Sequence, residues 1–183
     1  LSENLAKETV NNSILGGCAQ LTTLYVPAAA AYVPDSAYVA SLQNIIVVDD
    51  TGKKNVAGTN YASIDGVLFN AEGTSLLRFP LAYEDYSYNV PEQVKRIEAN
   101  AFHGSTIHRV SIHENVEYIG DSAFRETKML ILDLLGCQEM GDAAFYMSSI
   151  TTLHIGSHVK MLGDSAFKFC QSLVSLNIDE GLE

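Results

Sequence analysis

Apolar positions recur along this chain at a nearly constant interval. Between residues 97 and 167, four segments read IEANAF, IGDSAF, MGDAAF and LGDSAF. The phenylalanines that close them, Phe102, Phe124, Phe145 and Phe167, lie 22, 21 and 22 residues apart. A repeat of this length is typical of a solenoid, in which each unit buries its apolar residues against its neighbours. The pattern therefore predicts stacked coils and no single closed core.

A second apolar pattern follows each of these phenylalanines by five or six residues. Its spacing is 0, +3, +5, as in Ile107, Val110 and Ile112. The last two members alternate with other residues, which is the period of a strand with one buried face. The other sets are Met129, Leu132 and Leu134; Ile150, Leu153 and Ile155; and Leu173, Leu176 and Ile178. Each coil is predicted to add one strand to a parallel ladder, followed by a short second extended piece.

Three of the four corner segments contain Gly-Asp before the alanine and phenylalanine. We expect Gly120, Gly141 and Gly163 to take backbone angles that a side chain forbids. The aspartates that follow them are predicted to accept hydrogen bonds from the amides of a short helical turn. The alanine before each phenylalanine leaves room for the next coil, so the rings should stack in a ladder.

The same frame extends towards the N-terminus with less similar residues. Val33–Tyr38 reads VPDSAY and Val10–Leu15 reads VNNSIL, which put Tyr38 and Leu15 in the phenylalanine position. The strand spacing returns in residues 21–26. The repeats are therefore predicted to begin near the first residue.

Between Tyr38 and Phe102 the interval stretches to 64 residues. Two apolar runs in this stretch, within residues 61–70 and 75–80, are separated by a glycine-bearing turn, which predicts a β-hairpin. We expect this hairpin to be an insertion that projects from one edge of the solenoid. The predicted organisation is one solenoid domain over residues 1–183, with N-terminal repeats in 1–48, the hairpin insertion in 49–85 and C-terminal repeats in 86–183, ending within a repeat.

These motifs resemble the BspA-type leucine-rich repeat family. Its unit reads roughly AF-x2-C-x2-L-x2-V-x-I-P-x2-V-x2-I-G-x2-AF, and Cys170–Ile178 and Cys18–Pro27 match it closely. The hairpin sequence IDGVLF, followed by LRFP, also resembles an element of such arrays. The resemblance implies an α/β or mainly β solenoid of repeats of about 22 residues. It also implies a secreted or cell-surface protein.

Composition narrows the classes of partner. Eleven basic and 22 acidic side chains give a net charge of −11, spread over the whole chain. Nucleic-acid binding needs clustered Lys and Arg, so it is not expected. No apolar run approaches the ~20 residues of a membrane span. The three cysteines, Cys18, Cys137 and Cys170, are predicted to be buried free thiols.

No arrangement of residues predicts catalysis, a cofactor or a metal site. The five histidines occupy different repeat positions and lack the spacing of metal ligands. Residues 49–52, Asp-Asp-Thr-Gly, have only half of a calcium-loop pattern and are predicted to be an acidic turn.

The outward positions of the strand ladder form the candidate binding surface. They combine aromatic, imidazole, guanidinium and hydroxyl groups, a mixture typical of protein interfaces. Leu130 and Ile131 also point outward in this frame. A tyrosine-rich segment with Tyr83 and Tyr86 is a second candidate patch, whereas Tyr88 is predicted to pack inward. The candidate ligand-binding residues are Tyr25, His108, Arg109, Ser111, Asp133, Thr152, His154 and Asn177.

The leading hypothesis is a non-catalytic, surface-exposed adhesion module. The resemblance implies a protein ligand, such as a host matrix protein or another cell-surface protein. Two alternatives remain open. In the first, the chain is a structural spacer and its exposed strand residues are only solvated. In the second, the chain is a carbohydrate-active β-solenoid enzyme, but such an enzyme needs clustered carboxylates, and the acidic residues here are scattered. The oligomeric state is not predicted.

Overall fold

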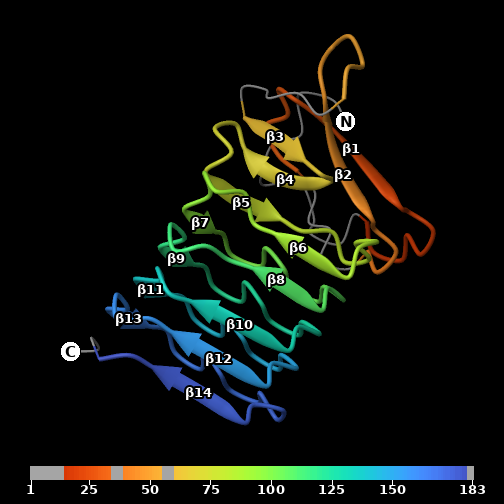
Figure 1. Ribbon diagram of the computed structural model, residues 1–183. Helices are drawn as coiled ribbons and strands as arrows, with labels where there is room; N and C mark the ends of the chain where they lie inside the picture. The colour runs from red at the N-terminus through yellow and green to blue at the C-terminus, as the bar shows by residue number, and fades with distance from the viewer. Residues whose placement is uncertain (1–14, 34–38, 55–59, 181–183) are drawn as a thin grey trace.

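The chain winds into a solenoid whose coils stack along one axis (Figure 1). The computed structural model describes residues 15–33, 39–54 and 60–180. Two sheets line the stack, a five-stranded front sheet of order β14-β12-β10-β8-β6 and a seven-stranded back sheet of order β13-β11-β9-β7-β5-β4-β3. A separate two-stranded sheet, β1-β2, lies at the N-terminal end.

The front sheet contains the strands predicted from the 0, +3, +5 spacing, and all its pairs are parallel. Its strands are β6 (Ser87–Asn89), β8 (Arg109–Ser111), β10 (Ile131–Leu134), β12 (Thr152–Ile155) and β14 (Ser175–Ile178). Val110, Leu132 and Leu153 point into the core and are buried. The alternation of buried and exposed residues therefore follows the predicted register, which confirms the parallel ladder.

The back sheet is built from the short second extended pieces. Its parallel strands are β5 (Ser75–Arg78), β7 (Arg96–Ile97), β9 (Tyr118–Ile119), β11 (Glu139–Met140) and β13 (Met161–Leu162). Ile97, Ile119 and Met140 are fully buried and face the front sheet across the core. Two layers of apolar residues thus meet inside the middle coils, whereas Leu176 and Ile178 on β14, at the end of the stack, are exposed.

The predicted hairpin does not project from the solenoid, because it continues the back sheet. Strands β3 (Tyr61–Ile64) and β4 (Val67–Asn70) pair antiparallel around Asp65 and Gly66, whose φ angles of 50° and 76° are those of a tight two-residue turn. Strand β4 then pairs antiparallel with β5. The division into repeats and insertion remains a prediction, but the strands β3, β4 and β5 within the predicted insertion belong to the back sheet.

Strand β4 separates two hydrophobic cores. Val67 and Phe69 belong to the large core of the C-terminal coils, whereas Leu68, between them, packs into the N-terminal core. That smaller core also contains residues of β1 (Thr23–Pro27) and β2 (Asn44–Val48), which pair in parallel. A single strand therefore serves as the boundary of both cores.

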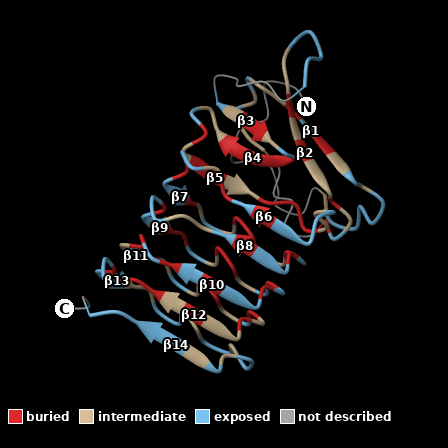
Figure 2. Cartoon of the chain, in the orientation of Figure 1, coloured by how far each residue is buried: buried red, intermediate tan, exposed pale blue. Residues whose placement is uncertain are grey.

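The phenylalanine ladder runs through the core along the corners, where Figure 2 shows buried residues in every middle coil. The rings of Phe102 and Phe124 stack at 4.9 Å between centroids, and those of Phe124 and Phe145 at 5.0 Å. Phe167 follows at 5.9 Å. The ladder has one member that the sequence analysis missed, Phe79, which stacks on Phe102 at 4.6 Å.

The corners are not helical, which corrects the predicted fold. No helix occurs in the described residues. Ser122, Ala143 and Ser165 have φ angles of 54°, 54° and 59°, so each breaks the helical turn that was expected. The corner amides instead donate hydrogen bonds to the next coil. The amide of Phe124, for example, donates to the carbonyl oxygen of Ala144 at 2.7 Å.

The corner glycines and aspartates also act between coils. A Cβ at Gly163 would lie 2.3 Å from the carbonyl carbon of Gly141, so glycine is needed for close stacking and not for an unusual φ. The carboxylate of Asp121 accepts a hydrogen bond from the amide of Asp142 (2.9 Å), and Asp142 accepts one from Asp164 (2.7 Å). These aspartates therefore join successive coils and do not cap helices.

Two of the corners predicted from the sequence belong to the N-terminal part of the chain. The corner predicted at Val33–Tyr38 and the one at Val10–Leu15 fall almost entirely outside the described residues. Among the cysteines, Cys137 is buried as predicted and Cys170 is half-buried. Cys18 is exposed, so its prediction as a buried thiol is wrong. Within the described ranges, no helix has the length and apolar character needed to cross a bilayer.

Candidate functional site

The outward side chains of the front sheet form the exposed strand face predicted from the sequence, here called the front face. Parallel register places them in columns that cross the strands. One column contains Ser87, Arg109, Ile131, Thr152 and Ser175. The structure thus brings together seven of the eight candidate residues, His108 immediately before β8 and six on β8, β10, β12 and β14.

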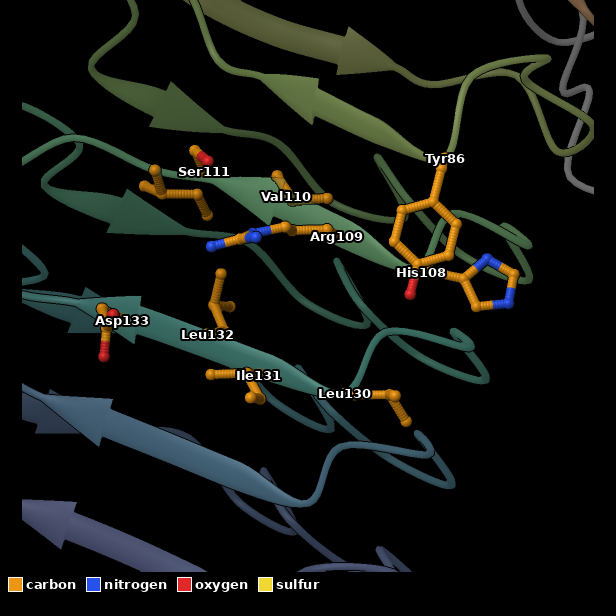
Figure 3. Close-up of a pocket in the computed structure, with 10 residues that line it drawn as sticks. Tyr86, His108, Arg109, Val110, Ser111, Leu130, Ile131, Leu132 and Asp133 are labelled. Carbon is orange, nitrogen blue, oxygen red and sulfur yellow. The ribbon is translucent and has the colours of Figure 1, made fainter.

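A groove of about 360 Å³ lies on the front face over β8 and β10 and reaches Tyr86, the residue before β6 (Figure 3). Four candidate residues line it, namely His108, Arg109, Ser111 and Asp133. Tyr86 closes one end, and Leu130 and Ile131 form an apolar side. The groove is therefore the place where the candidate polar residues meet exposed apolar surface.

The aromatic end of the groove unites the two patches predicted from the sequence. The rings of Tyr86 and His108 stack at 4.9 Å with an interplanar angle of 12°. Tyr86 remains 65% exposed. Tyr88 is buried, as predicted, and Tyr83 is half-buried against Phe79, so these two tyrosines belong to the core.

Arg109 lies in the middle of the groove, next to Ile131 on the adjacent strand. Figure 3 shows its side chain between the Tyr86 and His108 rings at one end and Asp133 at the other. Arg109 forms no ion pair or hydrogen bond through its side chain with another residue of the described ranges. Its guanidinium is exposed and its donors face solvent.

Below the groove, His154 joins three coils. Its Nε2 atom lies 3.1 Å from Oδ1 of Asp179, and its Nδ1 atom lies 3.9 Å from Oδ1 of Asp133. His154 is half-buried and occupies the position next to Asp133 in the parallel register. The contact with Asp179 is within hydrogen-bond distance and the one with Asp133 is longer, so Asp133 remains an exposed acidic group at one end of the groove.

The remaining candidates lie away from the groove. Thr152 and Asn177 continue the front face on β12 and β14, outside the groove lining. Tyr25 is on β1, in the separate N-terminal sheet, where the ammonium of Lys54 lies 5.3 Å from its ring centroid. Tyr25 is thus an exposed strand residue, as the sequence frame predicted, but its strand does not belong to the ladder of the other candidates, because β1 and β2 form a sheet of their own.

The described ranges contain no group of three or more His, Cys, Asp or Glu side chains able to hold a metal ion. The acidic turn after β2 is closed on itself. Oδ1 of Asp49 accepts hydrogen bonds from the hydroxyl of Thr51 (2.6 Å) and the amide of Lys53 (3.0 Å), which lower the pKa of that carboxyl. Asp49 thus serves the turn.

Cys137 is the fully buried thiol of the large core, against which the half-buried Cys170 also packs. Cys137 is fully buried beside the β11 strand, and burial raises the pKa of its thiol to about 12. A thiol in this state is protonated and a poor nucleophile at neutral pH. Cys137 therefore contributes packing and no reactive group.

Three solved structures resemble the fold. A leucine-rich cell surface protein from Faecalibacterium prausnitzii A2-165 has a TM-score of 0.57 at 23% identity, over 87% of this chain and 48% of that one. A leucine-rich repeat protein from Eubacterium ventriosum has a TM-score of 0.57 at 18% identity, over 85% of this chain and 48% of that one. The pneumococcal vaccine antigen PcpA has a TM-score of 0.53 at 20% identity, over 89% and 46%.

The chain spans about half the length of each of these structures. No curated protein matches the chain significantly. The model of the BspA type leucine rich repeat region matches residues 85–183 in six copies, which include the whole front sheet. Periodic corners, a parallel ladder and this match agree with one another, and the chain belongs to the BspA-type leucine-rich repeat family.

Proposed function

We propose that the front face binds a protein partner and that the chain acts as an adhesion module at a cell surface. The groove over β8 and β10 is the observation that carries this proposal. It places the exposed guanidinium of Arg109 beside the exposed apolar side chains of Leu130 and Ile131. Protein interfaces are enriched in aromatic residues and arginine next to buried apolar contacts.

The rigidity of the strand ladder favours binding over mere solvation. Outward residues on neighbouring parallel strands keep a fixed spacing, because both neighbours of each inner strand hold its backbone. A partner meets a preformed surface and little ordering entropy is lost from this side. Ile131 is 59% exposed although it lies at the centre of the sheet, and its burial requires a partner.

The proposed location rests on the relatives. One similar structure is a cell surface protein and another is a vaccine antigen. We extend a surface location to this chain, together with a protein ligand such as a matrix protein or a second surface protein.

The experiment compares two double variants of equal charge change. Ile131→Glu with Thr152→Glu alters neighbouring outward positions of the front sheet, whereas Tyr118→Glu with Met161→Glu alters the outward column of the back sheet. Circular dichroism first checks that both remain folded. Binding of each variant is then measured on immobilised fibronectin, collagen and laminin, and on beads coated with the wild-type chain.

We expect the front-sheet variant to lose at least about tenfold in affinity for the surface that the wild type binds, and the back-sheet variant to bind normally. Equal binding by the front-sheet variant would refute the assignment of the face. Absence of wild-type binding to all four surfaces would refute adhesion to these ligands and favour the structural spacer. The spacer remains the second candidate, because half-buried Thr152 and Ser175 on the same column are ordinary solvated strand residues.

A further inference from the structure

We infer that the groove recognises an extended protein segment that presents one carboxylate to Arg109 and, two residues away on the same face, an apolar side chain to Leu130 and Ile131. This inference rests on the proposed function and names the ligand class of the same face. It is carried by three features of one groove: a cation, Arg109, that has no ion-pair partner within the described ranges, an aliphatic surface and an aromatic wall.

The charge of the ligand follows from Arg109. Among the outward residues of the five described front strands, Arg109 alone is a lysine or arginine. The other strand arginine of the C-terminal coils, Arg96 on β7, is bonded to Glu98 (2.9 Å) and lies 3.7 Å from the ring centroid of Tyr118. Arg109 has neither kind of partner in the described ranges. Its planar set of donors fits a carboxylate with two parallel hydrogen bonds.

The groove also limits how many acidic groups the ligand presents. Asp133 lies at the end of the groove opposite Tyr86, with its Oδ1 atom 3.9 Å from Nδ1 of His154. A second carboxylate at that end would be repelled, and the chain as a whole carries a net charge of −11. A ligand with one acidic side chain at the centre would pair with Arg109, and neutral or basic groups at the other end would avoid repulsion by Asp133.

The apolar surface distinguishes a peptide from an acidic sugar. Leu130 is 43% exposed and Ile131 is 59% exposed, and both line the groove beside Arg109. A uronate sugar could pair with Arg109 and stack on Tyr86, but its hydroxyl groups would be desolvated against these two aliphatic side chains. A leucine two residues from a glutamate lies on the same face of an extended peptide and buries these two side chains favourably.

The test uses the folded chain and two capped peptides. The probes are acetyl-Leu-Ser-Glu-Ser-Leu-amide, in which the leucines and the glutamate share one face of the extended chain, and the same peptide with glutamine in place of glutamate, together with a glucuronate oligosaccharide. Affinities are measured by NMR titration of the ¹⁵N-labelled chain at 50 mM and 500 mM NaCl. The variants are Arg109→Gln, Arg109→Lys and the matched control Arg96→Gln on the back sheet.

We expect the wild type to bind the glutamate peptide at least about fivefold more tightly than the glutamine peptide, with shift changes centred on Arg109, Ser111 and Ile131. High salt should reduce this preference, because exposed charge pairs are screened. Arg109→Gln should abolish it, Arg109→Lys should keep part of it, and Arg96→Gln should leave it unchanged.

Equal affinity for both peptides, or tighter binding of the uronate, overturns the inference. The two proposals fail separately. If Ile131→Glu with Thr152→Glu abolishes binding to a protein-coated surface while the peptides are not discriminated, the front face binds protein but the ligand is not acidic. If that double variant binds as the wild type does, the face assignment fails as well.

Discussion

Replacing Phe124 by alanine tests the stacking of the coils directly. The ring is fully buried and lies between Phe102 and Phe145, at centroid distances of 4.9 and 5.0 Å. A buried aromatic side chain removes roughly 150–250 Å² from water. At about 25 cal/mol per Å², this corresponds to roughly 4–6 kcal/mol before the area still covered by alanine is subtracted. We therefore expect Phe124→Ala to lower the free energy of unfolding by about 3–5 kcal/mol.

Phe167→Ala is the internal comparison. Phe167 is half-buried and stacks on Phe145 alone, at 5.9 Å. Its loss should cost about half as much as the loss of Phe124, because burial and one ring contact are both smaller. Phe124→Leu should cost less than Phe124→Ala, since leucine fills most of the space.

Urea titrations followed by far-UV circular dichroism and by tyrosine fluorescence give the free energies. Coincidence of the two transitions checks that the coils unfold together. A loss below about 1 kcal/mol for Phe124→Ala, or an equal loss for Phe167→Ala, would contradict the ladder register described here.

Further perturbations address the other contacts between coils. Gly163→Ala would place a Cβ 2.3 Å from the carbonyl carbon of Gly141 and should cost about 1–3 kcal/mol in a urea titration, whereas a cost within error would show that the coils can separate there. Asp142→Ala removes the acceptor for the amide of Asp164 and should cost about 1 kcal/mol, with Asp142→Asn retaining part of it. In thiol labelling with Ellman's reagent at pH 8, the exposed Cys18 should react at once and Cys137 only on unfolding. Burial blocks access to Cys137 and raises the pKa of its thiol to about 12. Fast modification of Cys137 in the native protein would refute its burial. Since the protonated thiol is favoured in the fold, this group stabilises the protein fully below the pKa of the unfolded thiol, and that contribution should decline as the pH rises from about 9 towards 12.

The strand register could be predicted from the sequence, because the period-two alternation and the 22-residue interval both determine which residues of each coil face the core. Val110, Leu132 and Leu153 are buried at the expected positions. The corners were mispredicted for a physical reason. Local rules assign glycine and aspartate to turn angles and caps, whereas here Gly163 and Asp142 respond to the neighbouring coil, which a single repeat does not reveal.

Phe79 could have been found from the sequence. It precedes Phe102 by 23 residues, close to the repeat, but the run SLLRFP favoured the second half of a hairpin and hid its corner position. The groove was harder to predict. Outward positions identified Arg109, Ile131 and Asp133 individually, yet the stacking of Tyr86 on His108 depends on the path of a loop before β6 that has no repeat to copy.

The double role of β4 has a consequence for the protein under tension. Leu68 and Phe69 are neighbours in sequence but belong to opposite cores. Unfolding of the N-terminal core would expose one face of β4, and the other face of this strand covers the core of the C-terminal coils. A pulling force along the chain would therefore meet one mechanical unit at this point, and β1 and β2 would not separate as an independent module.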